Sequence, residues 1–526
     1  MKYIKYLLTL LFLLSGFIFP QVNPDNYLIG DEYTQLQKIS SLNPTSNTIT
    51  DIITVDDSLV WIGTSRGVSL STDRGETWRN FYGHPEFGTD NVSAIGYDSL
   101  SNTFWAATAR TVEQNSQQLP QGTGLKYTTN LGENWKSIPQ PLDNPNDTTV
   151  QYGINVLRAL PVTVAIQNLA YDIAFTQGTI WISTFAGGLR KAEIDSLMVN
   201  ENYTWQRVVL PPDNRNSIMP TDELDFCLSP VPGNFCSVGN LNHRAFAVIS
   251  TDDNILYVGT ANGINKSTDS GVSWVKFNHQ NQDEPISGNF ITALGYNSTN
   301  NTVWGSTWKA EDPNEFYAVS FSGNGGESWS TTLYDERPHN FGFKGTQTMV
   351  PTDNGVFRTS DGGNTWIAPG VIYDPVSNVT LNTSVFFSAA SQGTDVWVGS
   401  NDGLARIREN GFWQGTWKIY LASSPLTSDN ETYCYPNPFS PRQDQLKIKY
   451  STGGQDAEVT IRVYNFAMNY VSTIIQNAPR NKNIESTPDY WDGRDAKGNY
   501  VPNGVYFYRV EVSGMEPVFG KILVLQ

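Results

Sequence analysis

The chain has 526 residues, 51 Asp and Glu against 34 Lys and Arg, and a formal net charge of −17. This length allows more than one domain, and the acidic balance argues against nucleic acid as a partner. Gly (44), Pro (28) and aromatic residues are frequent, whereas charged residues make up 16%. That composition predicts an all-β protein. Three cysteines and four scattered histidines point to no metal centre and no cofactor.

Residues 1–20 have the pattern of a secretory signal peptide. Lys2 and Lys5 precede an apolar run over residues 7–19, which is short for a membrane span. No A-x-A cleavage pattern follows the run, so a retained N-terminal anchor stays open as the other interpretation. The mature chain is therefore expected to be exported through the periplasm and to be secreted or held at the cell surface.

One short pattern, Ser/Thr-x-Asp/Asn-x-Gly-x-x-Trp, occurs five times. The copies are residues 71–78, 128–135, 267–274, 322–329 and 359–366. Their shared positions are Asp73, Gly75 and Trp78; Asn130, Gly132 and Trp135; Asp269, Gly271 and Trp274; Asn324, Gly326 and Trp329; and Asp361, Gly363 and Trp366. Each copy predicts a tight turn whose Trp begins the next strand. The copies resemble the Asp-boxes (BNR repeats) of sialidase-type β-propellers, which implies a structural role for these residues.

Apolar strands recur upstream of these turns and set the expected architecture. Their central residues are Trp61, Trp105, Trp181, Tyr257, Trp304, Val350 and Trp397. Most of these anchors are spaced as four-stranded propeller blades require, so seven anchors predict a seven-bladed β-propeller over residues 27–422. Outer strands of the third and seventh blades are expected near Trp205 and Trp413. Residues 33–40 are a further candidate strand for closing the ring.

The pattern changes after residue 422. Residues 423–431 read as a polar linker, and alternating strands follow over 446–450, 459–465 and 520–525, with a Gly-rich turn and a long strand over 490–512. This predicts a small antiparallel sandwich over residues 432–526.

The motifs YPNPFSP, VTIRVYN and WDGRDAKGNYVPNGVYFYR in this region resemble the type IX secretion sorting domain and the Ig-like domain of the flagellar hook-capping protein. The resemblance implies that residues 432–526 engage outer-membrane secretion machinery. The final strand departs from the family, because it carries only Lys521 and ends in Gln526.

Two longer spacings between anchors predict insertions, over residues 137–165 and 211–244, that flank the third blade. The second insertion offers Asp222, Glu223, Asp225, His243 and Arg244 as binding residues near the channel mouth of blades two to four. Cys227 and Cys236 are candidates for a disulfide that stiffens this loop. The alternative is that both insertions are ordered spacers without a ligand.

No catalytic residue is assigned. The Arg-Ile-Pro motif that sialidases carry is absent, and no pair of carboxylates stands out from the many acidic residues. We therefore expect a non-catalytic module that binds an extracellular ligand, a glycan or a protein. A glycan-active hydrolase, xyloglucanase- or sialidase-like, and a purely structural surface component remain the alternatives.

Overall fold

The computed structural model describes residues 42–525 except 116, 200, 202, 378, 382, 423–425, 427, 436, 438, 442–444, 483 and 485–487. The expected signal peptide and the candidate closing strand over 33–40 lie outside these residues. The described residues fall within one compact unit, Ser41–Gln526.

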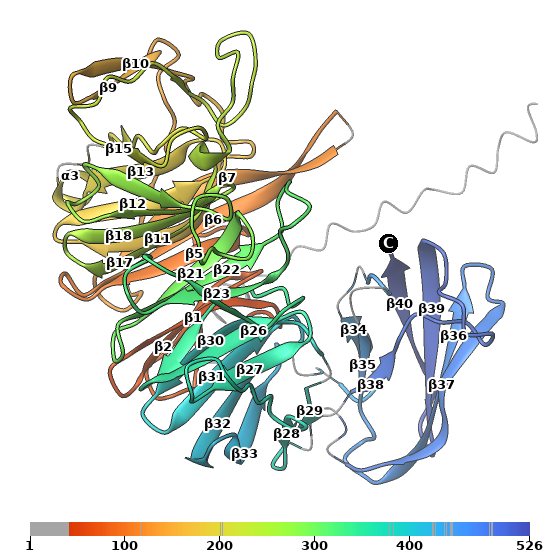
Figure 1. Cartoon of the computed structure of the whole chain (residues 1–526). Helices are drawn as coiled ribbons and strands as arrows, with labels where there is room; N and C mark the ends of the chain where they lie inside the picture. Colours follow the sequence, from red (N-terminus) through yellow and green to blue (C-terminus); the bar gives the residue numbers. More distant parts are fainter. Residues whose placement is uncertain are drawn as a thin grey trace, which may run out of the picture. The chain divides into compact units, whose positions relative to one another are not determined.

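Within the described residues, the chain from Ile49 to Tyr420 forms seven antiparallel sheets in series, here called sheets 1 to 7 (Figure 1). Sheets 1 to 3 contain β1 (Ile49–Val55), β2 (Leu59–Thr64), β3 (Gly67–Ser71) and β4 (Arg79–Asn80); β5 (Asn91–Asp98), β6 (Thr103–Gln114), β7 (Gln117–Thr128) and β8 (Lys136–Ile138); and β11 (Ala170–Thr176), β12 (Thr179–Thr184), β13 (Gly188–Glu193) and β14 (Gln206–Arg207). Sheet 4 contains β17 (Ala245–Asp252), β18 (Ile255–Thr260), β19 (Gly263–Ser267), β20 (Trp274–Phe277) and, on its outer edge, β15 (Ser217–Ile218). Sheets 5 to 7 contain β21 (Phe290–Asn297), β22 (Thr302–Trp308), β23 (Ala318–Ser322) and β24 (Ser330–Thr332); β25 (Gly342–Lys344), β26 (Gln347–Thr352) and β27 (Gly355–Thr359); and β30 (Phe386–Gln392), β31 (Asp395–Ser400), β32 (Leu404–Gly411) and β33 (Gln414–Tyr420).

The seven anchors predicted from the sequence all lie on the second core strand of their sheets, from Trp61 on β2 to Trp397 on β31. These strands are buried along nearly their whole length, as in the LVWIGT segment of β2, except that β6 is exposed beyond Ala109. Continuous burial explains their unbroken apolar sequence, because each strand is covered on both faces. The outer strands expected near Trp205 and Trp413 are β14 and β33.

The first and last sheets lie side by side. Thr54 Oγ1 of β1 donates a hydrogen bond to the carbonyl of Ser391, at 2.9 Å. The side-chain amide of Gln392 donates to the carbonyls of Val55, Asp56 and Leu59, at 3.4, 3.0 and 3.1 Å. Within the described residues these contacts close the series of sheets into a ring without an exchanged strand.

The five repeated motifs form one kind of turn, between the third and fourth strands of a sheet in sheets 1, 2, 4 and 5 and after the third strand in sheet 6. In the first copy, Asp73 Oδ1 accepts hydrogen bonds from the Thr77 N–H and the Ser71 hydroxyl, both at 2.8 Å. The Gly75 N–H donates to the Ser71 hydroxyl oxygen, at 2.7 Å. The other four copies repeat this pattern. A Cβ on Gly75 would lie 2.5 Å from the Trp397 ring, so the position requires glycine.

The two insertions pair with each other. Their strands are β9 (Thr149–Tyr152) and β10 (Asn155–Ala159) from the first insertion and β16 (Cys227–Leu228) from the second. β16 runs parallel to β10, so residues from two separate segments share one small sheet. The second insertion also contains the short helix η1 (Leu241–His243), whereas the helix α3 (Ile194–Met198) follows β13 in sheet 3. A further hairpin, β28 (Tyr373–Asp374) with β29 (Val379–Thr380), follows sheet 6.

The C-terminal region forms two antiparallel sheets. One contains β34 (Thr432–Tyr435), β35 (Leu446–Tyr450) and β38 (Asp489–Trp491); the other contains β37 (Tyr470–Arg480), β36 (Ala457–Asn465), β39 (Gly504–Val512) and β40 (Val518–Val524). Buried side chains of both sheets, among them Ile448, Ile461 and Tyr508, form one apolar core. The strands expected over 446–450 and 459–465 are therefore β35 and β36.

Candidate functional site in the axial cavity

The first strands of the sheets line a cavity of about 780 Å³ at the centre of the ring. β1, β5, β11, β17 and β21 contribute to its wall, together with residues 339–341 of sheet 6. A cavity of this size, lined by several elements of a rigid scaffold, matches the dimensions of small-ligand sites.

A bulge recurs at one level of this wall. The register of the first strand shifts by one residue in six sheets, between Ile49 and Asp51, Val92 and Ala94, Ala170 and Asp172, Ala245 and Ala247, Ile291 and Ala293, and Phe386 and Ser388. A bulge leaves one residue out of the ladder and redirects its side chain. The skipped residues are Thr50, Ser93, Tyr171, Phe246, Thr292 and Phe387.

Two carboxylates lie beside these bulges. Asp51 Oδ1 accepts hydrogen bonds from the Ile52 N–H, at 2.8 Å, and from the Asn340 amide, at 3.1 Å. Burial nevertheless raises the pKa of Asp51 from 3.8 to about 6. In the described structure, two bonds to one oxygen do not replace the hydration that the charged carboxylate loses.

Asp172 stands in the equivalent place on β11. Its oxygens accept the N–H groups of Ile173 and Val248, at 2.8 and 2.9 Å. Burial, with a smaller contribution from the negative charge of Asp51, raises the pKa of Asp172 from 3.8 to about 7. The two carboxylates therefore share one cavity and one electrostatic environment.

A row of aromatic side chains lies beside the cavity, and three of them, Tyr171, Phe246 and His339, line it. We call Tyr171, Phe246, Phe290, Trp308, His339 and Phe387 the aromatic rim. Successive rings along this order have centroids 5.3, 4.7, 6.4, 6.1 and 5.3 Å apart. All six residues are partly exposed, whereas the seven fully buried Trp residues, such as Trp61, pack between sheets. The rim thus offers an accessible row of flat apolar surfaces.

Two guanidinium groups stack on or beside the rim. Arg337 lies over the Trp308 ring at 5.9 Å and over Tyr317 at 4.7 Å. Arg244 lies over the ring of Phe185 at 5.2 Å, and Phe185 in turn contacts Phe246. These contacts are cation–π interactions.

The structure separates the five binding residues expected in the second insertion. β15 extends the outer edge of sheet 4. Beyond it, the Asp222 carbonyl accepts a hydrogen bond from the Asn155 amide of the first insertion, at 2.8 Å. The Asp222 carboxylate accepts the Met219 N–H, at 2.8 Å, and Glu223 and Asp225 are exposed. The hydroxyl of Tyr152, from the first insertion, donates a hydrogen bond to the Val272 carbonyl, at 2.8 Å. Val272 belongs to the repeated turn of sheet 4, so the first insertion contacts one of the repeated turns. None of the three acidic residues lines the cavity, and their role in binding stays a prediction.

His243 and Arg244 lie nearer to the rim because they directly precede β17. His243 is buried, and its Nε2 contacts the Leu210 carbonyl at 3.0 Å. Burial lowers the pKa of His243 to about 4, so the ring is neutral and structural. Of the five expected residues, only Arg244 lies beside the aromatic rim.

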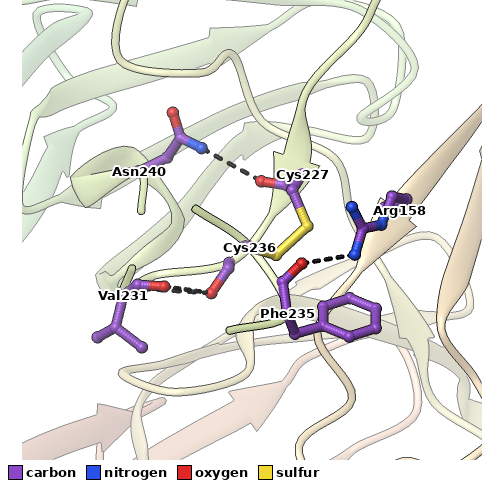
Figure 2. The surroundings of a disulfide bond; sticks show 7 residues. Arg158, Cys227, Val231, Phe235, Cys236 and Asn240 are labelled. Atoms are coloured by element: carbon purple, nitrogen blue, oxygen red, sulfur yellow. Dashed lines mark hydrogen bonds between the residues drawn. A yellow bond between two sulfur atoms is a disulfide. The ribbon is translucent and has the colours of Figure 1, made fainter. Parts of the chain in front are cut away.

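Cys227 and Cys236 form a disulfide in the second insertion (Figure 2). The Asn240 amide donates to the Cys227 carbonyl at 3.2 Å. Arg158, from the first insertion, donates to the Phe235 carbonyl at 2.6 Å and stacks over the Phe235 ring (Figure 2). The disulfide therefore fixes a loop that also holds the two insertions together. Cys434, the third cysteine, is buried with a free thiol.

The residues that line the cavity do not stand out in the sequence. In the sequence, Asp51 and Asp172 are two among many acidic residues, and Trp308 is one of 15 Trp residues. A comparison of the first strands alone would have revealed them, since aromatic residues replace Thr50 and Ser93 at the same position of other sheets. Among the described residues, no group of three or more His, Cys, Asp and Glu is placed to hold a metal ion.

No family model matches the chain. A search of curated proteins gives no match either. Solved structures match in fold. An ancestral GH74 enzyme aligns with a TM-score of 0.50 at 12% identity, over 92% of this chain and 63% of its own. YCF48 from Cyanidioschyzon merolae aligns with a TM-score of 0.40 at 12% identity, over 69% and 93%.

PorZ, described as a surface component of the type IX secretion system of Porphyromonas gingivalis, aligns with a TM-score of 0.27 at 13% identity, over 92% of this chain and 74% of its own. The ring of sheets and the GH74 alignment define the fold as a β-propeller, which confirms the predicted all-β propeller class. No helix within the described part of the chain is long and apolar enough to cross a membrane.

Proposed function

We propose that this protein is an exported, seven-bladed β-propeller that binds an extracellular ligand without catalysis, through the aromatic rim and the axial cavity. The aromatic rim carries the proposal, because partly exposed aromatic rings around a polar cavity provide both contact area and orientation for a ligand. The predicted signal peptide supports export to the cell surface or the medium. The five repeated turns act structurally and lie away from the site.

The test removes two rim rings from the mature full-length chain. Phe246→Ala combined with Trp308→Ala should abolish binding to the hits of a glycan array and a peptide array. Phe466→Ala is the matched control, since Phe466 is 75% exposed in the C-terminal region. If the rim variant keeps the wild-type binding profile at an unchanged melting temperature, the site is elsewhere.

Delivery by the C-terminal domain is the second part of the proposal. The motifs of residues 432–526 support a type IX-like sorting domain that engages outer-membrane secretion machinery. A chain lacking residues 432–526 should accumulate in the periplasm, whereas the intact chain reaches the surface or the medium. Surface delivery of the shortened chain would leave the C-terminal region with an accessory role.

Glycan hydrolysis is the second candidate, favoured by the Asp51 and Asp172 carboxylates in one cavity. A glycosidase needs two carboxyl groups, and a raised pKa suits the one that acts as an acid. Hydrolysis of a panel of oligosaccharides that is lost in Asp172→Asn, but not in the exposed control Asp195→Asn, would favour this candidate over binding alone.

A further inference from the structure

The axial cavity is acidic and lacks a balancing charge. The described residues that line it include four aspartates, Asp51, Asp98, Asp172 and Asp253, one histidine, and no lysine or arginine. The histidine, His339, directs its Nε2 to Asp353 at 2.8 Å. The hydrogen-bond partners of Asp51 and Asp172 are N–H groups, so neither carboxylate has a counter-ion within the described structure.

Asp51 and Asp172 are partly buried, and carboxylates that have lost water and have no counter-ion are costly to keep charged. We propose that the axial cavity binds an organic cation, an ammonium or guanidinium group on an extended basic peptide, between Asp51 and Asp172. This inference rests on the proposed ligand-binding function and names the chemical class of the ligand. The bound cation supplies the charge that the described cavity lacks.

An unused polar group in the wall supports the same class of ligand. The Ser93 hydroxyl is buried on β5 beside the cavity and has no hydrogen-bond partner among the described residues. Buried hydroxyl groups in native proteins nearly always have a partner. An ammonium or guanidinium group has several N–H donors, so one group can bond more than one oxygen of the cavity wall.

The aromatic rim fits a cation that passes through it. Ring faces attract ammonium and guanidinium groups, and Arg337 already stacks on the rim ring of Trp308. The protein's own side chains thus show that the rim accepts a guanidinium. The rest of an extended peptide would lie on the remaining rings.

A metal ion fits this cavity less well. Divalent cations need several oxygen or nitrogen ligands at short distance. The described residues hold no group of three or more acidic, His or Cys side chains placed for this role. The cavity volume of about 780 Å³ suits a side chain of a peptide rather than a bare ion.

Protonation of the two carboxylates couples this binding to pH. Burial raises the pKa of Asp51 to about 6 and of Asp172 to about 7, so both carry full charge only above neutral pH. Asp98, Asp253, His339, Tyr97 and Tyr171 are the other titratable groups that line the cavity. Because the cation binds the charged carboxylates, its affinity should rise between pH 5 and pH 8.

The experiment uses the mature full-length chain and two peptide pairs. Acetyl-Gly-Arg-Gly amide is compared with its citrulline counterpart, which has the same shape without the charge. Acetyl-Gly-Lys-Gly amide is compared with its acetyl-lysine counterpart. Calorimetric titrations are run at pH 8 and pH 5, with calcium chloride as a competitor in a separate titration.

We expect the charged peptides to bind at least about tenfold more tightly than the neutral ones at pH 8, and about tenfold more tightly at pH 8 than at pH 5. Asp51→Asn with Asp172→Asn should remove the preference for charge, whereas Asp195→Asn should keep it. The wild-type comparison of charged with neutral peptides needs no variant, so a poorly folded variant does not affect the test.

Equal affinity for charged and neutral peptides, or no measurable affinity for the charged ones, would overturn the inference. Displacement of the peptide by millimolar calcium would also overturn it, in favour of a metal site. Rim-dependent binding of a neutral ligand would leave the proposed function intact while the cation inference fails. If the array hits bind independently of the aromatic rim, both the proposed function and the cation inference fail.

Discussion

Trp78 and Trp397 meet edge to face, with ring centroids 6.2 Å apart and ring planes at 90°. Trp78 follows the repeated turn of sheet 1, and Trp397 is the anchor of sheet 7. Trp135 meets Trp61, and Trp366 meets Trp304, in the same geometry, at 6.0 and 6.2 Å. The repeated turn therefore supplies one ring to the anchor of the preceding sheet, and this contact joins neighbouring sheets around the ring.

Removing one such ring should destabilise the whole propeller. Trp78→Ala deletes a fully buried side chain, and we expect a loss of about 3–5 kcal/mol in the free energy of unfolding. Phe466→Ala, an exposed aromatic change, should cost less than about 0.5 kcal/mol. Chemical denaturation followed by tryptophan fluorescence measures both. Similar losses in the two variants would mean that the contact between sheets is not a main source of stability.

The glycines of the repeated turn differ in their tolerance to a side chain. Gly271 has a φ of 78°, and a Cβ there would lie 2.6 Å from the Trp181 ring. Gly362 has a φ of 71° but faces open space. Gly271→Ala should therefore cost at least about 2 kcal/mol more than Gly362→Ala, whose cost of about 1 kcal/mol is conformational only. Equal melting temperatures for the two variants would contradict the clash with Trp181.

Stability should depend on pH through Asp172. Its pKa is about 7 in the folded chain, against 3.8 for an ordinary aspartate. Between these values the folded chain keeps a proton that the unfolded chain has lost, so the free energy of unfolding falls as pH rises from about 4 to about 7. Asp172→Asn cannot ionise, so its free energy of unfolding should not fall with pH for this reason. We expect the melting temperature of Asp172→Asn, relative to wild type, to be several degrees higher at pH 8 than at pH 4.5.

The substitution also weakens the hydrogen bond to the Val248 N–H, but this loss is the same at both pH values. The difference between the two pH values therefore reports the charge effect alone. Asp195→Asn, an exposed change, should show the same difference from wild type at both pH values. A melting temperature of Asp172→Asn that tracks wild type across the range would show that Asp172 titrates normally.

The disulfide should stabilise the insertions rather than the ring. Cys227 and Cys236 are nine residues apart, and closing a loop of this size is worth about 2.5 kcal/mol in the chain-entropy model. In Cys227→Ser with Cys236→Ser, amide hydrogen exchange should accelerate over residues 213–243 and stay unchanged in β2 and β31. Uniform acceleration across all sheets would show that the insertion contributes to global stability.

The sequence predicts the sheets well and the site poorly, for different physical reasons. A second strand such as β2 is covered on both faces, so its apolar run and its Trp are visible in the sequence. The strand β37 gives no such pattern, because it is only partly buried and contains Pro479. The strand β15 has two residues and depends on contacts with β20, which no local pattern indicates.

The axial cavity depends on a bulge in the first strand, and a single bulge leaves no mark in the composition. Asp51 is distinguished from other aspartates only by its place beside that bulge and by Asn340, which lies far along the chain. The predicted insertions and the candidate disulfide could be read from spacing and cysteine count. The sequence could not indicate which acidic residues reach the axis, because their position depends on how seven sheets converge.

The contacts of Gln392 have a mechanical consequence. The side-chain amide of Gln392 donates hydrogen bonds to three carbonyls of the first sheet, whereas the strands within each sheet are joined by a series of backbone hydrogen bonds. Under a load that pulls Ile49 and Tyr420 apart, the junction between β1 and β30 is, among the described residues, the one where no chain segment connects the neighbouring sheets and side chains alone hold them. It is the seam at which the ring should open first, while each sheet keeps its own strands together.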